Sequence, residues 1–351
     1  MKFITRILTF LFVLAVTVSF AQSVIAPLAP ARPDPSLPST STQEDISTIS
    51  LDKSDLHADP PVLVEKDEEA DFVRELFHVE WRPHDSIYLY VVRPRNGPKT
   101  PVVIYLYGHP SETDRYQDDG WCKRRTAGGI AAVGFVPALT GQRYHDRPMK
   151  EWFVSELQES LGKSAHDVQM VLNYLGQRGD VDMSNVGMFG VGAGGTIAAM
   201  AASVDSRIKA VYLLDPWGDW PAWTAQSEII PEEERPRYIT PDFLKKVAAF
   251  DPVALLPRLK TQRIRLDQVS DDVGNTPEDA QKHIEAALPS GAEHHHFDGP
   301  EFFSVSSGGR VFDWIKFQVK IPDSKEHQSA STQPPLPDAH GQQEGAEKRQ
   351  R

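Results

Sequence analysis

The amino-acid sequence predicts an α/β protein with a mostly parallel central sheet and helices on both of its faces. Short apolar runs alternate with segments of helical periodicity, an order typical of strand–helix–strand units. The run from Pro101 to Tyr107 is apolar without interruption, which indicates a strand buried on both faces. A glycine-rich junction at residues 187–195 joins another predicted strand to an alanine-rich helix.

The elements follow one another in a regular order. The hydrophobic pattern predicts a hairpin of strands at 72–81 and 86–93, and further strands at 101–107, 135–139, 185–189, 208–214, 264–269 and 294–297. It predicts helices around 128–132 and at 153–175, 194–203 and 277–288. In a sheet of this kind the chemistry lies at the carboxyl ends of the strands.

The first 21 residues have the composition of a secretory signal peptide. Lys2 and Arg6 precede an apolar run from Ile7 to Phe20, which is short for a membrane span, and the small residue Ala21 suits cleavage. A second possible cleavage site follows Ala26. We therefore expect export to the periplasm or the medium, with no stable membrane span after cleavage. The alternative is an uncleaved N-terminal anchor.

The ordered part of the chain is expected between two polar segments. Residues 22–65 are rich in Pro, Ser and Thr and predict a disordered linker, and residues 323–351 predict a disordered tail. Residues 66–322 then form one domain, a length within the range of a single α/β domain.

Composition excludes several classes of function. The formal net charge of −12 argues against nucleic-acid binding and against adhesion to anionic lipid. The single cysteine, Cys122, allows neither an intrachain disulfide nor a cysteine-based zinc site. We expect no cofactor and no bound metal, and a small molecule as the ligand or substrate.

The glycine-rich junction carries a resemblance to a known family. Gly190-Val191-Gly192-Ala193-Gly194 resembles the G-x-S-x-G nucleophile elbow of the α/β-hydrolase superfamily, in its dienelactone hydrolase and prolyl-oligopeptidase branches. Gly192 stands where that motif has its serine. Glycine adopts the turn's backbone conformation without penalty, but it has no side chain to attack a carbonyl.

The resemblance implies roles for further positions across residues 70–320. Tyr107 and Gly108 correspond to the oxyanion loop, together with the backbone of Ala193, and residues 218–250 to a cap. Asp271 fits the position of the triad acid, with Asp272 as the alternative, and Glu301 stands at the histidine position. The resemblance therefore implies a hydrolase fold with degenerate nucleophile and histidine positions.

Alternatives remain open at several of these residues. His294, His295 or His296 could supply the histidine, or form a polar strand end. His109 and His145 could support displaced-residue hydrolysis or join Asp114, Asp271 and Glu301 in a metal cluster. Residues 190–195 also nearly fit a dinucleotide-binding G-x-G-x-x-G motif, with Asp215 as its acidic partner.

Three functions follow from these readings. The first is a catalytically impaired hydrolase-fold protein that retains a ligand pocket under Trp217, Trp220 and Trp223, residues that could equally form the core of the cap. The second is an active esterase-like or peptidase-like hydrolase with displaced residues. The third is an interaction protein of the cell envelope.

Overall fold

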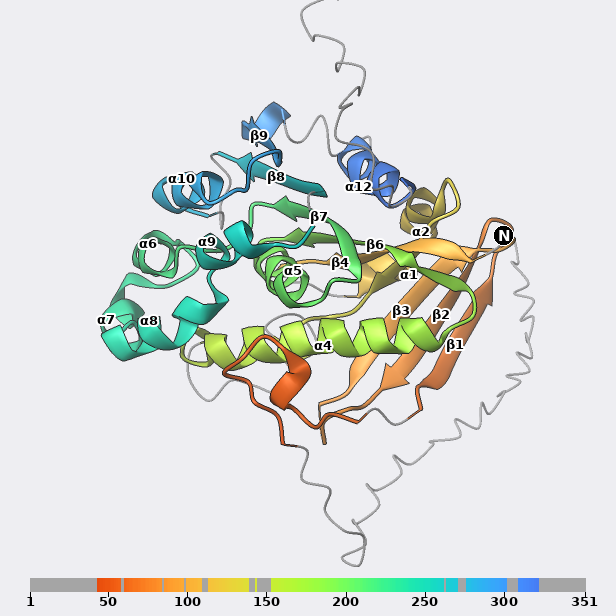
Figure 1. The fold of residues 1–351 in the computed structure, drawn as a ribbon, viewed down its shortest axis with the longest axis horizontal. Coiled ribbons are helices and arrows are strands. Elements are labelled where there is room, and N and C mark those ends of the chain that lie inside the picture. Colours follow the sequence, from red (N-terminus) through yellow and green to blue (C-terminus); the bar gives the residue numbers. More distant parts are fainter. Residues whose placement is uncertain are drawn as a thin grey trace, which may run out of the picture. The chain divides into compact units, whose positions relative to one another are not determined.

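The central sheet has nine strands in the order β1-β2-β3-β5-β4-β6-β7-β8-β9 (Figure 1). The computed structural model describes residues 43–57, 60–83, 85–97, 99–108, 113–138, 143, 153–261, 263–270, 276–301 and 309–321. The strands are β1 (Val62–Glu68), β2 (Phe72–Val79), β3 (Ile87–Pro94), β4 (Thr100–Leu106), β5 (Ala131–Gly134), β6 (Val181–Val191), β7 (Ile208–Leu214), β8 (Arg263–Val269) and β9 (Glu293–Phe297).

Strand direction divides the sheet into two parts. One part of the sheet is antiparallel, with β1 paired to β2, β2 to β3 and β3 to β5. The other part is parallel and runs from β5 through β4, β6, β7 and β8 to β9. The predicted mostly parallel sheet is therefore confirmed. Its parallel strands end at a common edge, and β6 lies in the middle of that edge, between β4 and β7.

Both faces of the sheet are covered, as the apolar run at β4 predicts. Val102, Ile104 and Leu106 point into one hydrophobic cluster, and Val103 and Tyr105 point into the other. The first cluster includes buried residues of α4 and α5, and the second includes those of α2 and α12 (Figure 1).

The helices connect these strands. The α-helices are α1 (Asp114–Gln117), α2 (Asp119–Thr126), α4 (Leu157–Gln177), α5 (Ala193–Val204), α6 (Trp220–Gln226), α7 (Arg235–Tyr238), α8 (Pro241–Val247), α9 (Pro252–Leu255), α10 (Glu278–Ala286) and α12 (Asp313–Gln318). Short 3₁₀ turns are η1 (Leu51–Lys53), η2 (Phe153–Glu156), η3 (Glu232–Glu234), η4 (Ala248–Phe250), η5 (Leu256–Arg258) and η6 (Arg310–Phe312).

One region departs from the predicted elements. The pattern predicts a helix around residues 128–132 and a strand at 135–139, but the helix α2 ends at Thr126 and the strand β5 spans 131–134. Gly128 and Gly129 both have positive φ, 85° and 79°, which a helix cannot contain. The two glycines therefore separate helix from strand, and the buried run of β5 begins immediately after them.

The packed part of the chain also begins before residue 66. Residues 43–57, called here the N-terminal strap, lie along α4, and β1 adds an edge strand from Val62 (Figure 1). A Cβ atom on Gly162 of α4 would lie only 2.6 Å from the carbonyl oxygen of Ile46, so strap and helix are in direct contact. Ile49 joins the core cluster. Part of the predicted linker is thus a packed element of the domain.

The predicted signal peptide, most of the linker and the C-terminal tail lie outside the described residues. Within the described residues, no helix combines the length and the apolarity needed to cross a membrane.

Candidate functional site

The turn between β6 and α5 has the backbone of a strand-to-helix elbow. Gly192 lies between Val191 and Ala193 with φ 54° and ψ −122°, a conformation that residues with a side chain rarely adopt. Its N–H donates to the carbonyl of Leu214 in β7 at 3.0 Å, and its carbonyl accepts from the N–H of Gly195 at 2.9 Å. The turn is therefore tied both to the neighbouring strand and to its own helix.

The glycines around the turn permit an unusually close approach of backbone segments. A Cβ atom on Gly190 would collide with the carbonyl of Gly194, and one on Gly194 would collide with the carbonyl of Leu106 in β4. Helix α5 therefore packs directly on the ends of β6 and β4. The small residues of the motif are explained by this contact, and no phosphate-binding role is needed to account for them.

An indole ring lies close to the Cα of Gly192, at the position of its missing side chain. A Cβ atom on Gly192 would lie 3.2 Å from Nε1 and 3.7 Å from Cε2 of Trp217, which is only 2 % exposed. Thr196 of α5 donates its hydroxyl to the Trp217 carbonyl at 2.6 Å, which fixes the backbone there. Trp217 therefore packs tightly against the position from which a nucleophilic side chain would start.

Trp217 belongs to a buried aromatic group. Its ring centroid lies 4.7 Å from that of Trp223, and Trp220 meets Trp223 edge-on at 5.7 Å. All three rings are buried and belong to the main core cluster. Of the two readings of these tryptophans, the structure therefore favours core of the cap over the lining of an open pocket.

The cap itself is held by a buried carboxylate. Residues 218–250 form α6, α7 and α8 with their short 3₁₀ turns. Asp251, directly after the cap, accepts the N–H groups of Asp219 and Trp220, both at 2.9 Å. Burial raises the pKa of Asp251 even though these hydrogen bonds oppose the rise. The beginning and the end of the cap are thereby joined.

The structure brings two of the predicted oxyanion residues together. A Cβ atom on Gly108 would lie 2.8 Å from the Val191 carbonyl and 3.3 Å from the Ala193 nitrogen, so Gly108 is in contact with the elbow. The side chain of Tyr107 instead packs in the second cluster. The Arg115 guanidinium lies 3.7 Å from its ring centroid, and the Trp121 indole donates to its hydroxyl at 3.3 Å.

Of the other predicted catalytic positions, only Glu301 lies within the described residues. Asp271, Asp272, His109 and His145 lie outside the described residues. Glu301 is exposed, and its N–H donates to the Asp298 carboxylate at 2.7 Å, which is a capping contact at the start of a short helical turn.

Two of the three histidines of β9 have contacts at the edge of the sheet, and the third, His296, is exposed. His294 contacts Gln268 at 3.0 Å through Nε2 and Glu285 at 3.2 Å through Nδ1. His295 stacks on Phe297, and burial lowers its pKa. These contacts fit the reading of a polar strand end.

Asp215 at the end of β7 is also fully engaged in the fold. Its carboxylate accepts the N–H of Thr276 at 3.0 Å and the side chain of Gln281 at 3.2 Å, and its own N–H donates to the Asp267 carbonyl at 2.8 Å. This buried carboxylate ties α10 to the sheet, and nothing in its contacts supports the dinucleotide reading. Among the described residues, no three potential metal-binding side chains lie close enough together to hold an ion.

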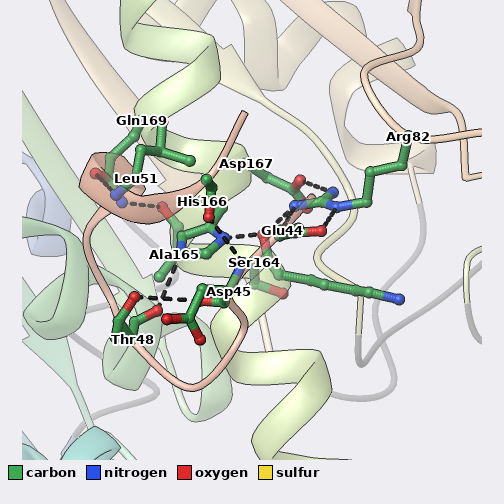
Figure 2. Close-up of polar contacts among 12 residues, drawn as sticks. Glu44, Asp45, Thr48, Leu51, Arg82, Ser164, Ala165, His166, Asp167 and Gln169 are labelled. Carbon is green, nitrogen blue, oxygen red and sulfur yellow. Dashed lines mark hydrogen bonds and ion pairs between the residues drawn. The ribbon is translucent and has the colours of Figure 1, made fainter. Parts of the chain in front are cut away.

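A buried charge network on α4 is the main polar feature that the sequence does not reveal. Asp167 is completely buried and accepts from Arg82 (Figure 2). It also accepts from Arg143 at 2.6 Å and from the Trp81 indole at 2.8 Å. Burial opposes ionisation of Asp167, but the two guanidinium charges lower its pKa to about 2. Charged residues on an amphipathic helix usually face solvent, so spacing alone gives no signal for this network.

The fold has clear counterparts among solved structures. An acetyl xylan esterase from Paenibacillus sp. R4 superposes with a TM-score of 0.55 at 16 % identity, covering 76 % of this chain and 90 % of that one. Acetyl xylan esterase 1 from Thermoanaerobacterium sp. JW/SL YS485 gives 0.52 at 14 % identity, over 74 % and 88 % of the two chains. An S-formylglutathione hydrolase from Agrobacterium tumefaciens gives 0.53 at 16 % identity, over 74 % and 99 %.

Sequence comparison adds nothing to this likeness. No family model and no curated protein sequence matches the chain. The assignment accordingly rests on the sheet order, the elbow between β6 and α5, and the structural counterparts. Together these show that the chain has the α/β-hydrolase fold.

Proposed function

We propose that this chain is an exported α/β-hydrolase-fold protein that has lost acyl-enzyme chemistry and acts by binding. The observation that carries the proposal is at the elbow, where Gly192 has no side chain and the Trp217 indole lies 3.2 Å from where its Cβ would be. A hydrolase of this fold needs a nucleophile at that point with a reacting carbonyl in front of it. Gly192 supplies no nucleophile, and the buried indole lies tightly against the position of its missing Cβ.

The neighbouring parts of the elbow support the same reading. Gly108 touches Val191 and Ala193, the contact that the proposed oxyanion region requires. Removing the nucleophile lowers the rate of hydrolysis by several orders of magnitude. The N–H donors of an oxyanion hole then sustain only a small residual catalysis. A protein that keeps this scaffold without its nucleophile is better suited to hold a ligand than to cleave one.

Labelling with a fluorophosphonate probe tests the loss of acyl-enzyme chemistry. We expect no labelling of the wild-type protein and no turnover of p-nitrophenyl acetate above the buffer rate. Ser203→Ala is a matched control, because Ser203 lies on α5 and its hydroxyl donates to the carbonyl of Met200 in its own helix. Turnover that disappears in His109→Ala or His145→Ala would overturn the proposal and establish displaced-residue hydrolysis.

Binding is tested by the shift in unfolding temperature. Two of the structural counterparts are acetyl xylan esterases, so acetylated xylo-oligosaccharides are a reasonable first set of probes. A ligand at about 100 times its Kd stabilises the folded state by about 2.7 kcal/mol, which is well within reach of a thermal-shift measurement. Probes that raise the unfolding temperature and are recovered unchanged support binding, whereas recovery of deacetylated sugar would contradict it.

Export is proposed on the charged start and apolar run of residues 1–21. Expression of the full chain followed by N-terminal sequencing of the mature protein tests it. We expect the mature chain to begin at Gln22, or at Pro27 if the second site is cleaved. A mature protein that retains Lys2 and stays with the membrane fraction would show an anchor instead.

A further inference from the structure

One buried histidine of α4 contacts the N-terminal strap at two points. His166 is completely buried, and its Nδ1 lies 2.7 Å from the carboxylate of Glu44 (Figure 2). Its Nε2 lies 3.0 Å from the backbone carbonyl of Thr48. Glu44 and Thr48 both belong to the strap, so the two ring nitrogens hold the same segment at two points.

Both partners of this imidazole are hydrogen-bond acceptors. A backbone carbonyl can only accept, and so can an ionised carboxylate. Burial opposes ionisation of Glu44, but its hydrogen bonds from His166 and Arg82 lower its pKa. A neutral imidazole carries one N–H and can satisfy only one of the two acceptors, whereas the imidazolium carries two N–H groups and satisfies both.

The carboxylates near His166 are also bound by arginines. Glu44 is bound by Arg82 at 2.5 Å and 2.6 Å, and Arg82 continues to Asp167 on α4. Arg143 then joins Asp167 to Asp85. In this network three carboxylates meet two guanidinium groups, so a protonated His166 would balance its charge. Asp45 is half-buried and adds negative potential, which Lys53 of the strap opposes.

We propose that His166 makes the strap a pH-sensitive latch, closed when the imidazole is protonated and weakened when it is neutral. The protonated ring gives an N–H to both strap acceptors, whereas the neutral ring leaves one of them without a donor, so the latch weakens when the ring loses its proton. At lower pH the latch persists until Glu44 is protonated. Because the pKa of Glu44 is lowered, this loss occurs below the ordinary range of a glutamate.

Release of the strap would alter the surface of the domain. Ile46 of the strap lines a cavity of about 390 Å³ together with Glu156 and Glu159 beside α4 and Tyr238 and Phe243 of the cap. Detachment would remove one wall of this cavity. It would also free the 15 residues from 43 to 57 from α4.

Hydrogen exchange at the Leu51 amide measures the latch directly. This N–H donates to the side chain of Gln169 on α4 at 3.2 Å, and Gln169 in turn donates to the Ile49 carbonyl at 2.7 Å. Exchange would be followed in the full chain at about pH 6 and about pH 8.5, with protection factors corrected for the intrinsic rate. We expect protection at Leu51 to fall about tenfold or more at the higher pH, the loss expected for one charge-assisted hydrogen bond.

Core amides such as that of Met188 in β6 serve as an internal reference and are expected to keep their protection. In His166→Gln, Leu51 should be less protected at both pH values, without the pH-dependent fall. The matched control is His57→Gln, because the His57 side chain is 80 % exposed in the same strap and its removal should leave the wild-type pH dependence intact.

Two results would overturn the proposal. One is protection at Leu51 that is independent of pH in the wild-type protein, and the other is a pH-dependent fall that persists in His166→Gln. If His166→Gln does not fold, NMR of the imidazole nitrogens in the wild-type protein provides a second test. Both His166 nitrogens should carry protons at about pH 6, and a single protonated nitrogen there would refute the latch.

Discussion

Replacing Gly192 by alanine tests whether the elbow has the conformation and surroundings described above. The residue has φ 54° and ψ −122°, where a Cβ atom is sterically strained, at a typical cost of about 1–3 kcal/mol. The new methyl group would also lie 3.2 Å from the Trp217 indole nitrogen, closer than the ordinary contact distance of about 3.5–4.0 Å. Both effects act in the folded state and both oppose folding.

The net effect is obtained by including the unfolded chain. Alanine restricts the unfolded state more than glycine does, which returns about 0.4–1 kcal/mol. We therefore expect Gly192→Ala to lower the free energy of unfolding by about 1–2 kcal/mol. Gly192→Ser should cost at least as much, because its hydroxyl would be placed against the indole. Urea unfolding measures both values, and labelling of Gly192→Ser by a fluorophosphonate should remain absent.

Gly176→Ala provides the matched control. Gly176 lies exposed near the end of α4, with no atom within 4 Å of the added Cβ and without a positive φ. Alanine in a helix stabilises by about 0.5–1 kcal/mol relative to glycine, so this variant should be slightly more stable than the wild type. If Gly192→Ala is as stable as Gly176→Ala, the described backbone of the elbow and the position of Trp217 are refuted.

Three further predictions concern the buried charges and the close packing of α5. Asp167→Asn should lower the free energy of unfolding by about 3–5 kcal/mol, because Arg82 and Arg143 lose the charge they share. The pKa of Asp167 is lowered to about 2, so its ionised form contributes about 2 kcal/mol to the free energy of unfolding. This contribution should be complete above the ordinary carboxyl pKa and should decline as pH falls from there toward the lowered pKa of Asp167. Urea unfolding over a pH series should therefore show the wild type and Asp167→Asn converging in acid, and a constant difference would contradict this. Gly194→Ala should prevent folding or cost more than about 3 kcal/mol by backbone collision, whereas Gly179→Ala, with open space at its Cβ, should be nearly neutral in the same assay.

The class of fold could be predicted from local pattern alone. The apolar run of β4 required two covered faces, and the Gly190–Gly194 motif required a strand and a helix in contact, because no other residue type fits there. Prediction failed at residues 128–139 because the apolar stretch could be divided in more than one way. The positive φ of Gly128 and Gly129 decided where α2 ended and β5 began.

The environment of each polar group depended on distant parts of the chain. Residues 43–57 have the composition of a linker, yet they are packed because His166, Gln169 and Arg82 offer buried partners more than 35 residues away in sequence. Asp167 looks like one charge on an amphipathic helix, and only the fold brings two guanidinium groups to it. Likewise, the motif alone does not reveal that Trp217 lies in front of Gly192.

The sequence by itself determined the layered α/β architecture and the absence of a nucleophilic side chain at Gly192. Both follow from local properties, namely the periodicity of apolar residues and the identity of one residue in a motif. The tertiary structure alone decided that an indole packs against the elbow and that a buried histidine contacts the strap at two points. These depend on contacts between segments far apart in the chain, for which the order of residues carries no local signal.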